Sequence, residues 1–132
     1  WRGEHVLPLV MDLGNPTPSL GWANRERLSL TERGPAHCCL ALALIHHLAI
    51  AANVPLPMVA SYLSTLSRYL VIEFVPKGDP QVQRLLRSRR DIFEGYTQEG
   101  FERTFEAEYE IVDRSVIRDS ERVMYLMKAH RA

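Results

Sequence analysis

The chain has 132 residues, which is enough for one compact domain and too few for two comfortable ones. Hydrophobic residues make up 46% and charged residues 24% of the chain, as in ordinary soluble globular proteins. Lys plus Arg and Asp plus Glu both number 16, so no basic bias points to a nucleic-acid partner. These numbers predict one globular domain that does not bind nucleic acid.

Membrane and secretory segments are not expected either. The longest apolar stretch, residues 38–45, ends at His46 and His47, too soon for a membrane span. The first residues, WRGEH, are polar and unlike a signal peptide. Cys38 and Cys39 are adjacent, a spacing that rarely gives a disulfide, so we expect a cytoplasmic protein with no membrane partner. A first residue of Trp rather than Met suggests a fragment or a processed product.

The first quarter of the chain predicts a strand, a loop and a short helix. Residues 5–13 (HVLPLVMDL) are rich in aliphatic and β-branched side chains and predict a short buried strand. Gly, Asn and Pro gather in residues 14–19, which therefore form a loop. Residues 24–31 carry mixed charge and predict a short helix that ends before a Gly-Pro pair.

A nearly continuous apolar run, HCCLALALI, occupies residues 37–45. Its Leu and Ala content would also suit a helix, but its length and the preceding Gly-Pro favour a strand buried on both faces. Pro55 or Pro57 then suits the first turn of a helix that runs to about Ser67.

In the next part of the chain a predicted strand is followed by two predicted helices. YLVIEFV, residues 69–75, predicts a strand, and residues 80–88 predict a helix. Thr97 is placed as the N-cap of a further helix whose inward face holds Phe101 and Phe105.

Two strand-like segments end the sequence. Residues 109–116 and 121–128 are joined by Arg-Asp-Ser and predict an antiparallel hairpin. Because strands alternate with helices before it, we expect an α/β fold with a mostly parallel sheet and this C-terminal hairpin.

These segments, in this order, resemble the later part of class I S-adenosylmethionine-dependent methyltransferases. In that family an acidic residue near the end of strand three helps to hold the adenine, and Asp12 in VMDLGN takes the matching place. Small-molecule members often carry an hHL signature after strand four, and here the apolar run leads into LIHHL, residues 44–48. Strand five and the substrate-side loop are matched by LVIEFVPK, residues 70–77.

The segment DLGNPTPSLGW, residues 12–22, also resembles a branch of bacterial methyltransferase-like proteins, some of them associated with nodulation. The resemblance implies a Rossmann-like methyltransferase sheet that lacks its first two strands. Residues 1–132 would then be a single partial methyltransferase domain that holds strands three to seven of the sheet. Two departures stand out: the glycine-rich turn after strand one is not within these residues, and strand four starts with His-Cys-Cys instead of an Asp-hydrophobic pair.

The resemblance also implies the chemistry. S-adenosylmethionine would be the cofactor, and a small molecule would accept the methyl group. The residues that would bind the cofactor are Asp12, Leu13, Asn15, Leu44 and Ile45. On the substrate side the candidates are Trp22 and Glu73.

His46 and His47 are the candidate catalytic residues. Methyl transfer is a displacement at an activated sulfonium, so the protein mainly positions the reactants and supplies a base where the nucleophile must lose a proton. The two histidines follow a predicted strand at the carboxyl edge of the sheet, where ligands collect in α/β folds. The structural alternative is that one of them caps the next helix or bonds a loop carbonyl.

The other candidates have structural alternatives as well. Asp12 would cap the turn that follows it, Trp22 would be ordinary packing, and Glu73 would pair with an arginine because a buried carboxylate needs a partner. No metal site is expected, because the clustered histidines and cysteines lack the paired spacing of metal ligands.

Two functions remain open at this level: a methyltransferase, or a non-catalytic methyltransferase-like binding or assembly module. Without strands one and two, the strand predicted at residues 5–13 has no neighbour for its backbone hydrogen bonds. We therefore expect either a missing N-terminal segment that completes the domain or pairing between chains in a homo-oligomer.

Overall fold

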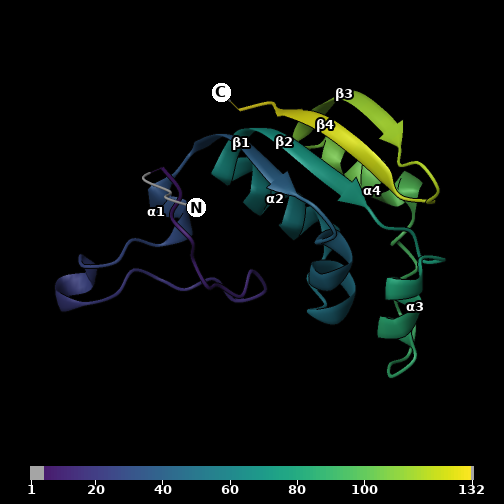
Figure 1. Ribbon diagram of the computed structural model, residues 1–132, viewed down its shortest axis with the longest axis horizontal. Coiled ribbons are helices and arrows are strands. Elements are labelled where there is room, and N and C mark those ends of the chain that lie inside the picture. Colours follow the sequence, from purple (N-terminus) through teal and green to yellow (C-terminus); the bar gives the residue numbers. More distant parts are fainter. Residues whose placement is uncertain (1–4, 132) are drawn as a thin grey trace.

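A computed structural model describes residues 5–131 as a four-stranded sheet with helices on one side (Figure 1). Before the sheet come the 3₁₀ turn η1 (Trp22–Asn24) and the one-turn helix α1 (Leu30–Arg33). The sheet and its connections are β1 (Ala36–Ala41), the π-helical turn η2 (His47–Ala51), α2 (Leu56–Leu66), β2 (Ser67–Phe74), α3 (Pro80–Leu86), α4 (Gln98–Glu106), β3 (Tyr109–Val116) and β4 (Val123–Ala129).

The sheet is mixed, with the strand order β1-β2-β4-β3. β1 pairs with β2 in parallel, while β4 pairs antiparallel with both β2 and β3. Since β2 and β3 both oppose β4, three of the four strands point the same way. Leu40, Val71 and Leu126 lie in one row across the first three strands. The α/β class and the C-terminal hairpin are thus confirmed. The expectation of a mostly parallel sheet is wrong for residues 5–131, because β1–β2 is parallel and the pairings of β4 with β2 and β3 are antiparallel.

The core lies between the sheet and the two helices α2 and α4, which cover the same face (Figure 1). Phe101 on α4 is its centre, with ring centroids 5.0 Å from Phe74, 4.3 Å from Phe105 and 5.2 Å from Tyr125. All four rings are buried. Such contacts combine large apolar burial with favourable edge and offset geometries, so they hold the hairpin and α4 to β2.

The helices begin where the local sequence predicts. α2 has a proline in its first turn. α3 starts at Pro80 after Asp79, whose carboxylate accepts a hydrogen bond from the Gln81 amide at 2.8 Å. Thr97 caps α4 by accepting one from the Gly100 amide at 3.0 Å. The N-cap predicted at Thr97 is confirmed, as are the helices that were expected after Pro55 or Pro57 and from Pro80.

The strand predicted at residues 5–13 is wrong. The segment belongs to no strand, and Val6, Leu7 and Val10 are 56%, 66% and 97% exposed. Within residues 5–131 no strand pairs with it, and an apolar sequence alone does not form a strand without such a partner. The loop predicted at residues 14–19 is confirmed.

The helix predicted at residues 24–31 is also wrong. Ala23 and Asn24 both have φ of 56°, which a continuing helix does not allow, and Leu20 then forms an isolated bridge with Arg27. Helix α1 begins only after Ser29, which forms a reciprocal capping box with Glu32.

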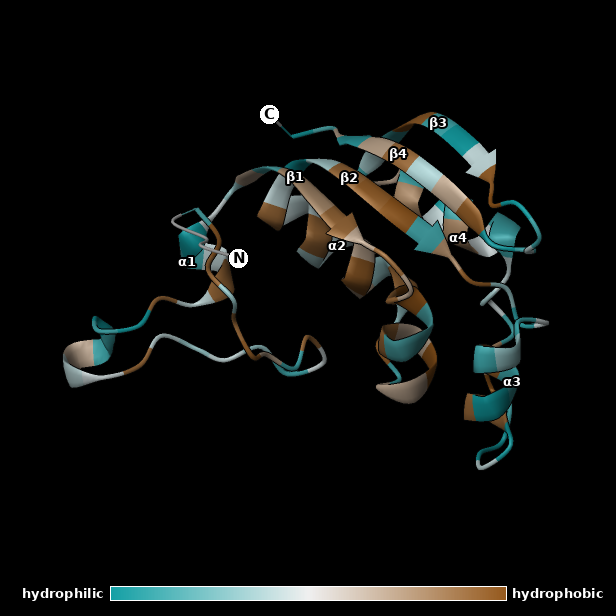
Figure 2. Ribbon diagram, in the orientation of Figure 1, coloured by the Kyte–Doolittle hydropathy of each residue, from teal (hydrophilic) through white to brown (hydrophobic). Residues whose placement is uncertain are grey.

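The strand predicted at residues 37–45 exists but differs in length and surroundings. β1 ends at Ala41, because Ala43 turns the chain with φ of 49° and the helical turn η2 follows. β1 is also an edge strand with one face open: Leu40 is 66% exposed. Figure 2 shows that β1 is hydrophobic along most of its length although it lies at the edge of the sheet. The prediction of burial on both faces was wrong because no element in residues 5–131 covers the second face.

Of the five strands that the resemblance implies, the described residues contain four. None of the helices in residues 5–131 is long and apolar enough to cross a membrane. Cys38 and Cys39 are free thiols, the first exposed and the second half-buried.

Candidate functional site

The carboxyl ends of β1 and β2 bring five polar side chains into one region. His46 immediately precedes η2 and His47 begins it, just beyond β1, and Glu73 lies near the end of β2. Asp79 caps α3, and Arg122 directly precedes β4. In open α/β sheets this edge is where ligands usually bind, so it is the candidate site.

Arg122 joins the two carboxylates. Its Nη1 donates to Glu73 Oε1 at 2.9 Å, while Nε and Nη2 donate to Asp79 Oδ2 at 2.6 Å and Oδ1 at 3.2 Å. The side chains of Glu73 and Asp79 are each 9% exposed, and that of Arg122 is 21% exposed. Bidentate charge-assisted bonds of this kind are strong and directional. We call these three residues the Arg122 clamp.

The other carboxylate oxygen of Glu73 holds the loop after β1. Glu73 Oε2 accepts a hydrogen bond from the Ala43 amide at 2.8 Å. Ala43 has φ of 49°, in the left-handed region that disfavours residues with a Cβ. Since His46 follows three residues later, Glu73 ties the path of the histidine loop to the end of β2. Glu73 thus has the arginine partner that its burial demanded.

Contacts within the Arg122 clamp shift the pKa values of Asp79 and Arg122. Hydrogen bonding by Arg122 holds the pKa of Asp79 below its usual value, and the two carboxylates raise the pKa of Arg122. Asp79 and Arg122 are therefore charged at neutral pH, and the hydrogen-bonding positions of all three side chains are largely used by these contacts.

His46 and His47 differ sharply in their surroundings, although their ring centroids are only 4.2 Å apart. His46 is 1% exposed, and its Nδ1 has no hydrogen-bond partner. Burial, together with the nearby His47 and Arg122, lowers the pKa of His46 to about 4, so its imidazole is neutral at pH 7. His47 is exposed to solvent. Only His47 is open to a molecule arriving from outside.

An apolar cleft of about 420 Å³ lies beside this region, between β1, α2 and the N-terminal segment. Two of the predicted cofactor residues, Leu13 and Leu44, line it. The rest of its wall is mostly aliphatic, with Leu40, Leu48, Met58, Val59, Leu63 and Leu66 among its members. Ile45 instead is 1% exposed and belongs to the core. The cleft suits a flat or elongated apolar group more than a charged one.

Asp12 and Asn15 interact within their own loop. Asp12 Oδ1 accepts a hydrogen bond from the Gly14 amide at 2.8 Å, and the Asn15 amide donates to the Asp12 carbonyl at 3.1 Å. Both residues are exposed. The loop-capping alternative for Asp12 therefore accounts for its contacts.

Trp22 lies apart from the other candidates. It is 86% exposed, in a turn that Figure 1 draws far to the left of the sheet. Accordingly, the structure brings His46, His47 and Glu73 together at one sheet edge and Leu13 and Leu44 together in one cleft. It does not gather the whole predicted set into a single pocket.

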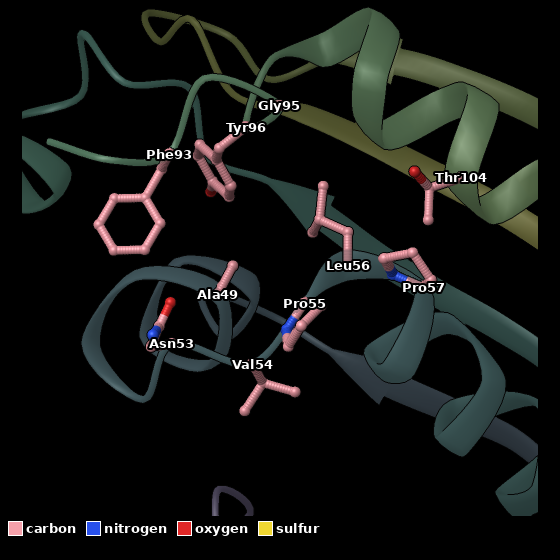
Figure 3. A pocket seen from close by; sticks show the side chains of 10 residues that line it. All are labelled: Ala49, Asn53, Val54, Pro55, Leu56, Pro57, Phe93, Gly95, Tyr96 and Thr104. Carbon is pink, nitrogen blue, oxygen red and sulfur yellow. The ribbon is translucent and has the colours of Figure 1, made fainter.

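A second, smaller cavity of about 230 Å³ opens between the start of α2 and the turn before α4 (Figure 3). Pro55, Leu56 and Pro57 form one side, and Phe93 and Tyr96 lie across from them. The Tyr96 hydroxyl donates to the Val75 carbonyl at 2.6 Å, which fixes the ring that lines this cavity. None of the residues predicted for the site lies here.

Sequence reasoning missed Asp79 and Arg122. Asp79 has a visible signal, an Asp-Pro pair at a helix start, but that signal indicates capping alone. Arg122 stands in a hairpin turn and is 43 residues from Asp79 and 49 from Glu73, so no local spacing links them. Within residues 5–131, no three His, Cys, Asp or Glu side chains are grouped so that they could hold a metal ion.

Comparison with known proteins gives one informative relative. The chain is 43% identical over 122 residues to the nodulation protein NoeA of Rhizobium meliloti (strain 1021). The match covers 92% of this chain but only 26% of that protein, so the chain spans about a quarter of the relative's length. No protein-family model and no solved structure matches the chain. The chain is therefore related to part of that nodulation protein.

Proposed function

We propose that this chain is part of a Rossmann-like, class I S-adenosylmethionine-dependent methyltransferase domain. The supporting observation is the sheet: three strands share one direction, and the last strand is inserted antiparallel between β2 and β3. That arrangement agrees with the ending of the methyltransferase sheet that the sequence resembles. The histidine loop follows β1 at the carboxyl edge, which is the edge that such enzymes use.

The residues present fit the cofactor only in part. Leu13 and Leu44 give an apolar wall that suits a flat purine ring. One carboxylate oxygen of Asp12, however, already accepts a hydrogen bond from the Gly14 amide. The glycine-rich turn that would approach the rest of the cofactor is not among the 132 residues. S-adenosylmethionine, when bound, would supply an activated methyl group. This chain by itself offers an incomplete site for it.

The chain's own contribution lies on the substrate side. His47 is exposed and is the better candidate to accept a proton from a small-molecule nucleophile, whereas His46 is buried and neutral and supports the loop. The Arg122 clamp positions that loop through Glu73 and the Ala43 amide. We place this activity in the cytoplasm and, following the relative's name, in nodulation.

A non-catalytic binding or assembly module is the second candidate. It is favoured by the separation of the predicted residues, since Trp22 lies far from the histidine pair and His46 is closed to solvent. The clamp likewise has few hydrogen-bonding positions left for a substrate.

Calorimetric titration of S-adenosylhomocysteine distinguishes the two. We would titrate it into this chain and into the full-length Rhizobium meliloti relative, with both proteins checked for folding by circular dichroism. We expect binding by the full-length relative and binding by this chain that is at least about tenfold weaker. If neither folded protein binds, the methyltransferase proposal is wrong and the binding module is the better account.

For the cleft, Leu44→Asp in the relative's matching position should weaken binding by about tenfold or more, because it puts a charge on an apolar wall. Leu42→Asp is the matched control, since Leu42 is 51% exposed and does not line the cleft. Equal effects of the two substitutions would argue against the cleft as the place where the purine binds.

A further inference from the structure

His47 begins the π-helical turn η2, and one hydrogen bond links the two ends of that turn. The Ala52 amide donates to the His47 carbonyl at 2.9 Å, and the next residue, Asn53, ends the turn with φ of 53°. π-helical turns are rare and are found frequently at functional sites. Because this bond joins the residue after η2 to His47, a contact that fixes the end of η2 also fixes the backbone of His47.

The end of η2 has backbone carbonyls that need a partner from elsewhere in the protein. The last carbonyls of a helical turn have no amide within the turn from which to accept a hydrogen bond. Ile50 is 0% exposed, so water does not satisfy its carbonyl and the protein must do so. η2 has no basic residue in its own last turn that could provide the donor.

Arg89 provides the missing donor. Its Nη1 donates to the Ile50 carbonyl at 2.6 Å and to the Ala51 carbonyl at 3.1 Å. Arg89 belongs to the connection between α3 and α4, residues 87–97, which lies far from η2 in the sequence. A guanidinium at the C-terminal end of a helical turn bonds the open carbonyls and brings the positive charge that this end favours.

The α3–α4 connection is itself held to the segment that follows β2. Lys77 Nζ lies 3.0 Å from both carboxylate oxygens of Asp91. The Tyr96 hydroxyl donates to the Val75 carbonyl at 2.6 Å, and Tyr96 is buried. Arg89 therefore extends from a segment that is attached at two points, and it couples that segment to the end of η2.

We propose that Arg89 is a positioning residue for His47, which holds the end of η2 so that the His47 ring keeps its place at the carboxyl edge of the sheet. The proposal rests on the role proposed above for His47 as proton acceptor. Glu73 holds the histidine loop before η2 through the Ala43 amide, and Arg89 holds it after η2. Since the two contacts come from different parts of the chain, loss of Arg89 should loosen η2 and leave the Arg122 clamp in place.

Amide hydrogen exchange at Ala52 measures the opening of η2. Arg89→Gln removes the cation, and Arg90→Gln is the matched control because Arg90 is the exposed neighbouring arginine and makes neither of these bonds. Exchange at Ala52 should be faster by about tenfold or more in Arg89→Gln and unchanged in Arg90→Gln. Arg89→Lys keeps a cationic donor and should have a smaller effect. The Phe101 amide, which bonds the Thr97 carbonyl in α4, reports on the whole fold and should be unchanged in all three variants.

A second measurement follows the His47 ring itself. The ring centroids of His46 and His47 are 4.2 Å apart, so nuclear magnetic resonance should record a cross-peak between the two rings in the native chain. Arg89→Gln should remove this cross-peak and Arg90→Gln should keep it, because a loosened η2 no longer holds His47 against the buried His46.

Three results would overturn the proposal. The first is unchanged exchange at Ala52 in Arg89→Gln, and the second is an intact cross-peak between the histidine rings despite faster exchange. The third is equal acceleration at Ala52 and Phe101, which would assign Arg89 to the stability of the whole domain. Neither measurement uses cofactor or substrate, so a failure of this proposal is distinguishable from a failure of the methyltransferase proposal.

Discussion

Residues 5–35 and residues 36–131 have similar kinds of side chains but very different packing. Val6, Leu7 and Val10 in the first region are mostly exposed, while Leu70 and Ile72 in the second are 0% and 1% exposed. Every buried hydrophobic residue of the described chain lies at Ala41 or beyond. Both regions contain short apolar segments with strand-like sequences, yet only the second forms a sheet.

The difference shows that strand-forming sequence takes effect through neighbours. β2 has a hydrogen-bonded partner on each side and helix α2 against one face, so its apolar side chains are removed from water. The segment 5–13 has none of these in the described chain. Strand preference is mostly a matter of fitting a half-buried pleated surface, and without that surface it has little effect.

The largest expected effect tests where the stability resides. Phe101→Ala removes the ring at the centre of the core and should lower the free energy of unfolding by about 3–5 kcal/mol. Trp22→Ala removes a larger side chain that is 86% exposed and should change it by less than about 0.5 kcal/mol. Urea unfolding followed by circular dichroism measures both. A Trp22 effect comparable to that of Phe101 would mean that residues 5–35 are packed more tightly than the exposure of their side chains indicates.

Arg122→Leu should lower the free energy of unfolding by about 2–3 kcal/mol, because it leaves two nearly buried carboxylates without their cation. Arg122→Lys keeps the charge but not the bidentate geometry, so a loss of about 1 kcal/mol is expected. Chemical denaturation at pH 7 compares the three proteins. If leucine and lysine are equally tolerated, the clamp contributes nothing through its charge.

His46 makes stability depend on pH. The pKa of His46 is lowered from 6.5 to about 4, so below pH 6.5 the unfolded chain takes up a proton that the folded chain does not. Stability is therefore full above pH 6.5 and falls as the pH drops toward 4, by about 2 kcal/mol between pH 7 and pH 5. The lowered carboxyl pKa of Asp79 acts below this window. His46→Leu should flatten the change in urea midpoint between pH 7 and pH 5, and an unchanged slope would remove His46 as its cause.

The smallest effects compare two helix caps. Thr97→Ala deletes the cap of the packed helix α4 and should cost about 1 kcal/mol. Ser29→Ala deletes the cap of α1, a four-residue helix that buries no residue, and should have less effect on global unfolding. Thermal melts of the two variants give the ordering, and a larger shift for Ser29→Ala would contradict it.

Local signals in the sequence predicted most of the packed region correctly. The proline in the first turn of α2, Pro80 at the start of α3 and the Thr97 cap of α4 are signals that depend only on residues nearby in the sequence. The β3–β4 hairpin was found because its strands are close in sequence. Features that depend on distant partners were predicted wrongly. One is the strand at residues 5–13. The other is the end of β1 at Ala41, which depends on the left-handed backbone of Ala43 and on its hydrogen bond to Glu73.

The candidate site divides in the same way. The order of elements along the chain predicted His46 and His47 at the carboxyl edge of the sheet, and the pairing of Glu73 with an arginine was among the alternatives for that residue. The sequence gives no signal for the difference in burial between the two histidines, because they are adjacent residues of the same type. Arg122 could not be assigned to Glu73 and Asp79, because only the folded topology brings the hairpin turn beside the start of α3.

The sequence distance spanned by the Arg122 clamp has a consequence for the order of folding. Loops of 43 and 49 residues must close before the clamp can form, and closing them costs conformational entropy before the contacts of the clamp stabilise the chain. We therefore expect the clamp to form after the transition state. Stopped-flow measurements should find that Arg122→Leu speeds unfolding and leaves refolding almost unchanged, which would make these three side chains a kinetic latch on the native state.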